Sequence, residues 1–161
     1  RDYHLHIETF HESPIISVYG GKITTCRLLA TDVADEIERL LGAKGAAWTH
    51  QTPLPGGEIV ERNFFEFIGD MSAYYHWLPV EILTRMAKAY GARVMTILGG
   101  ATQHEQLGRD FGGGLYQAEV DYLVREEWAR TADDILWRRT KLGLHVTPDT
   151  VAALKRYLGE V

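Results

Sequence analysis

Only the start of the chain has the pattern of β-strands, and this limits the possible folds more than any other feature. Tyr3, Leu5 and Ile7 alternate with polar residues, which is the period of a half-buried strand. After a turn at residues 12–14, the apolar and β-branched run 15–19 predicts a second strand. Two strands joined by a turn form a hairpin, which is marginally stable unless it joins a larger sheet. The remaining sequence offers no strand to complete one.

Beyond these strands, apolar residues recur at helical spacing. Residues 25–46 predict a connecting helix that Gly42 ends, and the proline- and glycine-rich residues 47–62 predict an extended loop. From residue 63 onward, the apolar spacing and capping residues predict a bundle of five or six short helices. We therefore predict a mainly α-helical fold, with segments 1–24, 25–46, 47–62 and 63–161.

Two details of the bundle are specific enough to test. One helix is expected over 116–129, and both Trp128 and Trp137 are expected to pack between helices as part of the core. The last helix is expected to begin after Thr147, with Pro148 at its first position.

Composition excludes several classes of protein. The chain has 161 residues, 45% of them hydrophobic, which is enough for a folded core and excludes a disordered chain. Its net charge of −5 disfavours a general nucleic-acid binder, which needs a basic surface. No apolar stretch approaches the roughly 20 residues that cross a bilayer. The single cysteine, Cys26, excludes an internal disulfide and a cysteine-rich metal site, which favours the cytosol or a cytosolic membrane face.

The chain begins with an arginine on a strand-like stretch rather than with a methionine. It also lacks the basic start and apolar run of a signal peptide. We therefore expect it to be a piece of a longer protein.

One segment has the features of a ligand-binding turn: Val18-Tyr19-Gly20-Gly21-Lys22-Ile23-Thr24-Thr25-Cys26-Arg27. A strand leads into two glycines, a lysine and two threonines before a helix begins. Glycines allow a ligand to approach the backbone, and the free N–H groups of a helix start attract anions. A tight turn with a solvated lysine explains the same pattern, and the spacing is not that of a Walker phosphate loop. The residues alone leave both interpretations open.

Other polar residues give weaker signals. Arg1 could bind an anion, although a terminal residue without a role is the favoured interpretation. His4 and His6 share a strand face and could bind a metal with His11, but solvated histidines are far commoner, and we predict no metal site. Cys26 is interpreted as a buried structural cysteine rather than a reactive thiol.

A basic run, Arg138-Arg139-Thr140-Lys141, could hold a phosphate. Pairing with nearby acids such as Asp133 and Asp134 is the favoured interpretation. No set of nucleophile, base and orienting acid can be assembled from the sequence.

Taken together, these segments resemble a known family. Arg1-Asp2-Tyr3 and the turn around Lys22 are similar to the end of the catalytic region of FAD-dependent glycerol-3-phosphate dehydrogenase. Later segments resemble the C-terminal helical domain of that family: Ala47-Trp48-Thr49, Leu54-Pro55-Gly56-Gly57, Tyr90-Gly91, Glu119-Val120-Asp121-Tyr122-Leu123-Val124 and Asp133-Asp134-Ile135-Leu136-Trp137-Arg138-Arg139-Thr140-Lys141. The Trp-Arg-Arg-Thr-Lys ending is similar to the aerobic, quinone-linked branch.

The resemblance implies a membrane-associated flavoenzyme. Such an enzyme oxidises sn-glycerol 3-phosphate to dihydroxyacetone phosphate, with FAD as hydride acceptor and a quinone as electron acceptor. It implies that Arg1 binds the substrate phosphate and that Gly21, Lys22 and Thr24 face the flavin, with Lys22 also near the substrate. The helices would serve as a cap or association domain, carry no catalytic residue that can be mapped, and could support a homodimer. The location implied is the cytoplasm or the cytoplasmic face of the inner membrane, by peripheral association.

The chain departs from a complete flavoprotein because it has no Gly-x-Gly-x-x-Gly dinucleotide-binding turn. We therefore expect the isolated chain to bind no FAD and to be inactive. Two alternatives stay open: a stand-alone helical interaction module, and a sensor that binds a phosphorylated ligand through Lys22 and the adjacent helix start.

Overall fold

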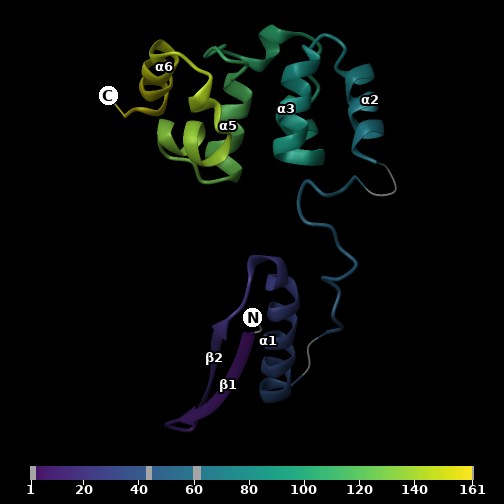
Figure 1. Cartoon of the computed structure of the whole chain (residues 1–161), viewed down its shortest axis with the longest axis vertical. Coiled ribbons are helices and arrows are strands. Elements are labelled where there is room, and N and C mark those ends of the chain that lie inside the picture. Colours follow the sequence, from purple (N-terminus) through teal and green to yellow (C-terminus); the bar gives the residue numbers. More distant parts are fainter. Residues whose placement is uncertain (1–2, 43–44, 60–62, 161) are drawn as a thin grey trace. The chain divides into compact units, whose positions relative to one another are not determined.

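A computed structural model describes residues 3–42, 45–59 and 63–160. The chain divides into two compact units, Arg1–Pro53 and Leu54–Val161. We call the first the hairpin unit and the second the helical unit. The prediction of a mainly helical chain with an N-terminal hairpin is confirmed (Figure 1).

The hairpin unit begins with two antiparallel strands, β1 (Tyr3–Phe10) and β2 (Ser13–Gly20), paired along their whole length. The turn between them consists of His11 and Glu12, whose φ angles are both positive, 46° and 66°. Two positive φ angles match the twist of a two-residue hairpin turn. The turn therefore comes earlier than the predicted 12–14, and β2 begins at Ser13.

One helix lies along the hairpin (Figure 1). A short helical turn, η1 (Ile23–Thr25), leads into α1 (Cys26–Leu41), which ends at Gly42 as predicted. The Tyr3 hydroxyl of β1 donates a hydrogen bond to the Asp32 carboxylate of α1. This bond ties the helix to one face of the strand pair.

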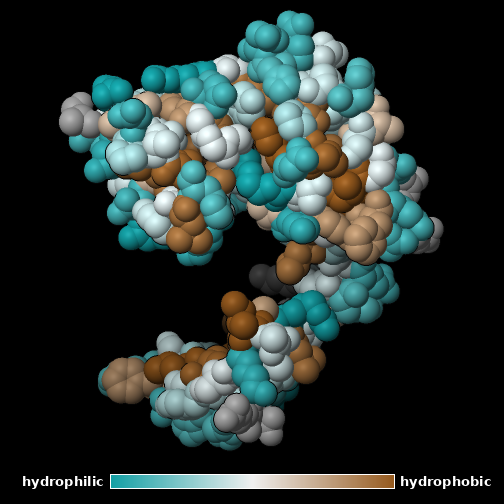
Figure 2. All heavy atoms as spheres, turned by 45° about the horizontal axis from the view of Figure 1, so that its top comes forward, coloured by the Kyte–Doolittle hydropathy of each residue, from teal (hydrophilic) through white to brown (hydrophobic). Residues whose placement is uncertain are grey.

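No described residue of the hairpin unit is fully buried. Figure 2 shows hydrophobic side chains lying open on its surface. The predicted burial of Cys26 is wrong, because α1 contacts the hairpin on one side only and the cysteine at its first position is exposed. The large apolar side chains exposed in this unit are Phe10, Ile15, Val18, Tyr19, Ile23, Leu28, Ile37, Leu40, Leu41 and Trp48.

The helical unit is built from short helices joined by tight turns. Its α-helices are α2 (Phe64–Tyr74), α3 (Val80–Tyr90), α4 (Val94–Leu98), α5 (Gln117–Glu126) and α6 (Pro148–Leu158), and its shorter turns are η2 (Gly91–Arg93), η3 (His104–Leu107), η4 (Asp134–Arg139, a π-helix) and η5 (Leu142–Leu144).

Local sequence determines where several of these helices begin. The Asn63 side chain accepts hydrogen bonds from the N–H groups of Phe65 and Glu66, both at 3.0 Å. Thr147 caps α6, whose first residue is Pro148, as predicted. Each cap satisfies N–H groups that have no partner inside the helix.

The core of the helical unit lies where α3, α5, η4 and α6 meet. Completely buried apolar residues come from each of these elements: Leu83, Val120, Leu123, Ile135, Leu136 and Leu154. Such burial is the main favourable term in folding. The helical unit therefore has a hydrophobic core of its own.

Both tryptophans that we expected in the core lie outside it. α5 ends at Glu126 rather than 129, and Trp128 adopts a left-handed φ of 59° and is 77% exposed. Both Glu127 and Ala129 donate their N–H groups to the Leu123 carbonyl, which turns the chain before Trp128 can continue the apolar face. Trp137 is 44% exposed because the wider π-helix shifts it away from the predicted helical face.

Candidate functional site

The turn after β2 holds the site residues that the sequence predicted. Gly20 and Gly21 have positive φ angles, 80° and 102°, which residues other than glycine rarely adopt. A Cβ on Gly21 would also lie 3.2 Å from Leu29 Cδ1. The backbone conformation therefore favours glycine at position 21, and a Cβ there would also require the Leu29 side chain to shift slightly.

Thr25 organises the helix start that follows. Its hydroxyl accepts a hydrogen bond from the Lys22 N–H at 3.2 Å and donates one to the Lys22 carbonyl at 3.0 Å. The Lys22 amide is therefore used inside the turn, whereas its side chain is exposed. Thr24 is exposed, and within the described residues its side chain makes no hydrogen bond.

The structure thus brings Gly21, Lys22 and Thr24 together on one open turn. Arg1 lies outside the described residues. A primary ammonium beside a helix start can hold a phosphate or stabilise negative charge on a bound ring. Chemically, the turn suits an anionic or electron-rich ligand.

Histidines of the strands do not gather into a ligand set. His6 lies 3.9 Å from the Glu8 carboxylate, and both side chains are more than half exposed. Across the described residues, no group of three or more His, Cys, Asp or Glu side chains is placed to hold a metal.

In the helical unit, two glycine motifs contact each other. The Ala92 N–H donates to the Gly56 carbonyl at 2.8 Å, and a Cβ on Gly91 would lie 2.0 Å from that same oxygen. A Cβ on Gly56 would lie 2.4 Å from the Tyr90 carbonyl. The loop Leu54–Gly57 therefore lies directly against the end of α3, and only glycines allow this approach.

A buried ionic cluster holds α3 against α5. Arg85 donates two hydrogen bonds to the Glu119 carboxylate, both at 2.7 Å, and one to the Gly114 carbonyl at 2.9 Å. Tyr90 donates to the same carboxylate at 2.7 Å, and burial together with the negative charge of Glu119 raises the pKa of its hydroxyl. Glu119 is only 1% exposed, so its charge depends on these donors.

Sequence reasoning missed this cluster. Glu119 lies four residues before Leu123, so helical spacing places it on the apolar face of α5. A carboxylate on a buried apolar face needs a hydrogen-bonding or ionic partner, so the position of Glu119 in the sequence could have indicated the cluster.

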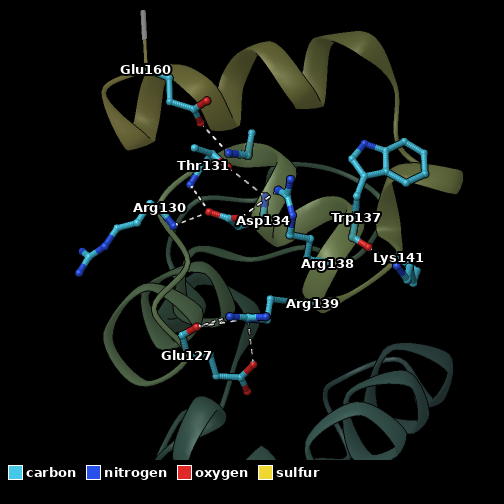
Figure 3. Close-up of polar contacts among 10 residues, drawn as sticks. Glu127, Arg130, Thr131, Asp134, Trp137, Arg138, Arg139, Lys141 and Glu160 are labelled. Carbon is cyan, nitrogen blue, oxygen red and sulfur yellow. Dashed lines mark hydrogen bonds and ion pairs between the residues drawn. The ribbon is translucent and has the colours of Figure 1, made fainter.

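The basic run pairs with Asp134, as predicted, whereas Asp133 makes no ion pair with it within the described residues (Figure 3). Arg138 contacts the Asp134 carboxylate at 2.9 Å, and Arg139 donates to the Glu127 carbonyl at 2.8 Å and 3.2 Å. Asp134 also accepts hydrogen bonds from the backbone N–H groups of Arg130 and Thr131. These backbone bonds, with the nearby Arg138, lower the pKa of Asp134 to about 2.

No described helix is long and apolar enough to span a membrane. Comparison with known families then decides the class of protein. Residues 47–160 match the C-terminal domain of alpha-glycerophosphate oxidase. The chain belongs to the glycerol-3-phosphate oxidase and dehydrogenase family.

Individual relatives in the glycerol-3-phosphate dehydrogenase family match almost the whole chain. A glycerol-3-phosphate dehydrogenase of Pseudomonas aeruginosa is 43% identical over 98% of this chain and 31% of its own length. A D-erythritol 1-phosphate dehydrogenase of Brucella abortus is 42% identical over 95% of this chain and 30% of its own. The aerobic glycerol-3-phosphate dehydrogenase of Escherichia coli is 38% identical over 99% of this chain and 32% of its own.

This chain spans about a third of the length of these relatives and corresponds to the C-terminal part of glycerol-3-phosphate dehydrogenases. The domain match begins at residue 47, so it covers the helical unit but not the Lys22 turn. The alignments with whole relatives do extend over that turn.

Proposed function

We propose that this chain forms the C-terminal part of an FAD-dependent enzyme that oxidises sn-glycerol 3-phosphate to dihydroxyacetone phosphate and passes the electrons to a quinone. The observation that carries the proposal is alignment of nearly the whole chain with dehydrogenases of this substrate. The aerobic name of the Escherichia coli relative supports a respiratory acceptor.

Within that enzyme, the turn after β2 would face the flavin ring. Lys22 and Thr24 are both exposed on this turn and can therefore reach a ligand. FAD would supply the hydride acceptor. The Lys22 ammonium would stabilise negative charge on the reduced ring and attract the substrate phosphate, a role it would share with Arg1.

The helical unit would act as a cap or association domain. Its core is complete without the hairpin unit, and the ionic cluster around Glu119 is satisfied internally, so neither is available for chemistry. We propose a homodimer, located in the cytoplasm or peripherally on the cytoplasmic face of the inner membrane. Light scattering and partition between membrane and soluble fractions test these two points.

A chimera tests the catalytic proposal. This chain would replace the aligned C-terminal part of the Pseudomonas aeruginosa enzyme, and substrate-dependent reduction of a quinone analogue would be measured. We expect a flavin-containing, active chimera in which Lys22→Ala lowers kcat/KM at least about tenfold, because a charge-assisted contact is lost. Lys155→Ala, on the exposed surface of α6, is the matched control and should leave kcat/KM unchanged.

An active chimera unaffected by Lys22→Ala would reject the role of the turn. Flavin absorbance that copurifies with the isolated chain would contradict the expectation that the chain alone binds no FAD.

D-erythritol 1-phosphate is a second candidate substrate, because the Brucella abortus relative is nearly as similar as the Pseudomonas aeruginosa one. Both compounds carry a phosphate monoester on a polyol, so the Lys22 turn suits either. Assaying the same chimera with both substrates decides between them by the ratio of kcat/KM.

A further inference from the structure

A cavity of about 280 Å³ lies in the helical unit, apart from the Lys22 turn. It is slightly smaller than sites for drug-sized ligands, which measure about 300–1,000 Å³, and so suits a smaller molecule. The loop before Gly56, the end of α3, η2 and α5 form its walls. Its lining residues are Pro55, Ala89, Tyr90, Arg93, Tyr122, Glu126 and Glu127.

Two hydrogen-bond donors, Tyr122 and Arg93, line this cavity. Tyr122 is only 5% exposed and packs edge-to-face on Tyr90 with ring centroids 5.6 Å apart, yet its hydroxyl makes no hydrogen bond within the described part of the chain. The half-buried Arg93 likewise has no hydrogen bond or ion pair there. Among the described residues no fully buried side-chain nitrogen or oxygen lacks a partner, so the Tyr122 hydroxyl and the Arg93 guanidinium open onto the cavity and can donate to a ligand there.

Both carboxylates of the cavity already have a guanidinium. Arg125 Nε lies 2.8 Å from Glu126 Oε1. Arg139 Nε lies 3.7 Å from Glu127 Oε2, a pair that Figure 3 shows. The uncompensated charge at the cavity is therefore the positive charge of Arg93. Each carboxylate keeps further lone pairs that can accept hydrogen bonds from hydroxyl groups.

We propose that this cavity binds a small anion that also carries hydroxyl groups, a phosphorylated or carboxylated polyol. Arg93 and Tyr122 donate to the anionic group, because a guanidinium fork matches the oxygens of phosphate and carboxylate alike. Glu126 and Glu127 accept hydrogen bonds from the hydroxyls. The site is non-catalytic, and it does not rest on the function proposed for the Lys22 turn.

Calorimetric titration of the full chain tests the ligand class with four compounds. These are sn-glycerol 3-phosphate, D-glycerate, inorganic phosphate and glycerol, which vary the anionic group and the hydroxyls separately. We expect saturable binding of the first or second, weaker binding of inorganic phosphate, and none of glycerol. Whichever of sn-glycerol 3-phosphate and D-glycerate binds more tightly shows whether the cavity prefers a phosphate or a carboxylate.

Variants assign the binding to the cavity. Arg93→Gln should weaken it at least about tenfold, since it removes the charge but keeps most of the side chain. Tyr122→Phe should weaken it about threefold to tenfold, because it keeps the ring against Tyr90 and removes only the hydroxyl. Lys155→Gln, on the exposed surface of α6 and distant in sequence from the cavity, should bind as the wild type does.

Three results would overturn the proposal: no saturable binding of any of the anions, unchanged affinity in Arg93→Gln, or glycerol bound as tightly as its phosphate. Binding abolished by Lys22→Ala and kept in Arg93→Gln would place the ligand at the turn instead. Because the chimera assay reads turnover and this one reads binding to the chain alone, either proposal can fail without the other.

Discussion

The two units of this chain are built from similar amphipathic segments but bury them differently. In the helical unit, the apolar residues of four elements meet in a core with complete burial. In the hairpin unit, α1 covers one side of two strands, and no described residue is fully buried. The comparison shows that an amphipathic pattern predicts which face of a helix or strand needs to be buried. It does not say which other segment covers that face.

Deleting the same side chain in each unit gives the largest expected contrast. Leu123→Ala should lower the free energy of unfolding by about 2–5 kcal/mol, because it leaves a cavity in a complete core. Leu28→Ala, at a leucine of α1 that is 49% exposed, should change it by less than about 0.5 kcal/mol. Urea denaturation followed by circular dichroism measures both. Equal losses would show that the hairpin unit has a core as well.

Ion pairs should follow the same division. Glu119→Gln should destabilise the chain by about 3 kcal/mol, because it leaves Arg85 and Tyr90 facing a weaker acceptor in a buried cluster. Glu36→Gln removes the exposed pair with Arg39 in α1 and should cost at most about 0.5 kcal/mol. The same denaturation experiment compares the two variants. A smaller loss of unfolding free energy for Glu119→Gln than for Glu36→Gln would contradict the view that the buried pair matters more to stability.

Local chemistry made much of this fold predictable. The start of α6 at Thr147 and Pro148 and the end of α1 at Gly42 are set by residues within a few positions of the boundary. The end of α5 was not predictable, because Trp128 occupies a left-handed position that sequence patterns assign to glycine. A π-helix over Asp134–Arg139 likewise leaves no periodic signal by which to predict it.

The candidate sites divide in a comparable way. The residue types and spacing of the Lys22 turn are visible in the sequence, because strand, glycines and helix start are adjacent there. The contact of Gly56 with Gly91, and the cavity that brings Arg93 to Tyr122, join segments far apart in the chain. Such contacts depend on tertiary packing, which one sequence does not specify locally.

A pair of glycines with the same backbone conformation isolates the steric part of the Gly56 contact. Gly91 and Gly99 have φ angles of 56° and 55°, and both end a helix of the helical unit. A Cβ at Gly91 would meet the Gly56 carbonyl, whereas one at Gly99 would meet nothing within 4 Å. Gly91→Ala should therefore be more destabilising than Gly99→Ala by about 1–3 kcal/mol, the usual cost of overpacking. Thermal unfolding of both variants measures the difference. Equal melting temperatures would mean that the loop Leu54–Gly57 moves aside without loss of stability.

The smallest expected effect depends on pH. The pKa of Asp134 is lowered from 3.8 to about 2 by hydrogen bonds from the backbone N–H groups of Arg130 and Thr131, and by Arg138. A lowered pKa in the folded state means that the carboxylate contributes stability above pH 3.8, and that this contribution is lost as the pH falls toward about 2. The melting temperature of Asp134→Ala should therefore lie below that of the wild type at neutral pH and approach it near pH 2. Asp35→Ala, at an exposed position of α1 in the hairpin unit, is the control and should melt as the wild type does at neutral pH. A gap between Asp134→Ala and wild type that stays constant down to pH 2 would mean that Asp134 acts through packing and not through its charge.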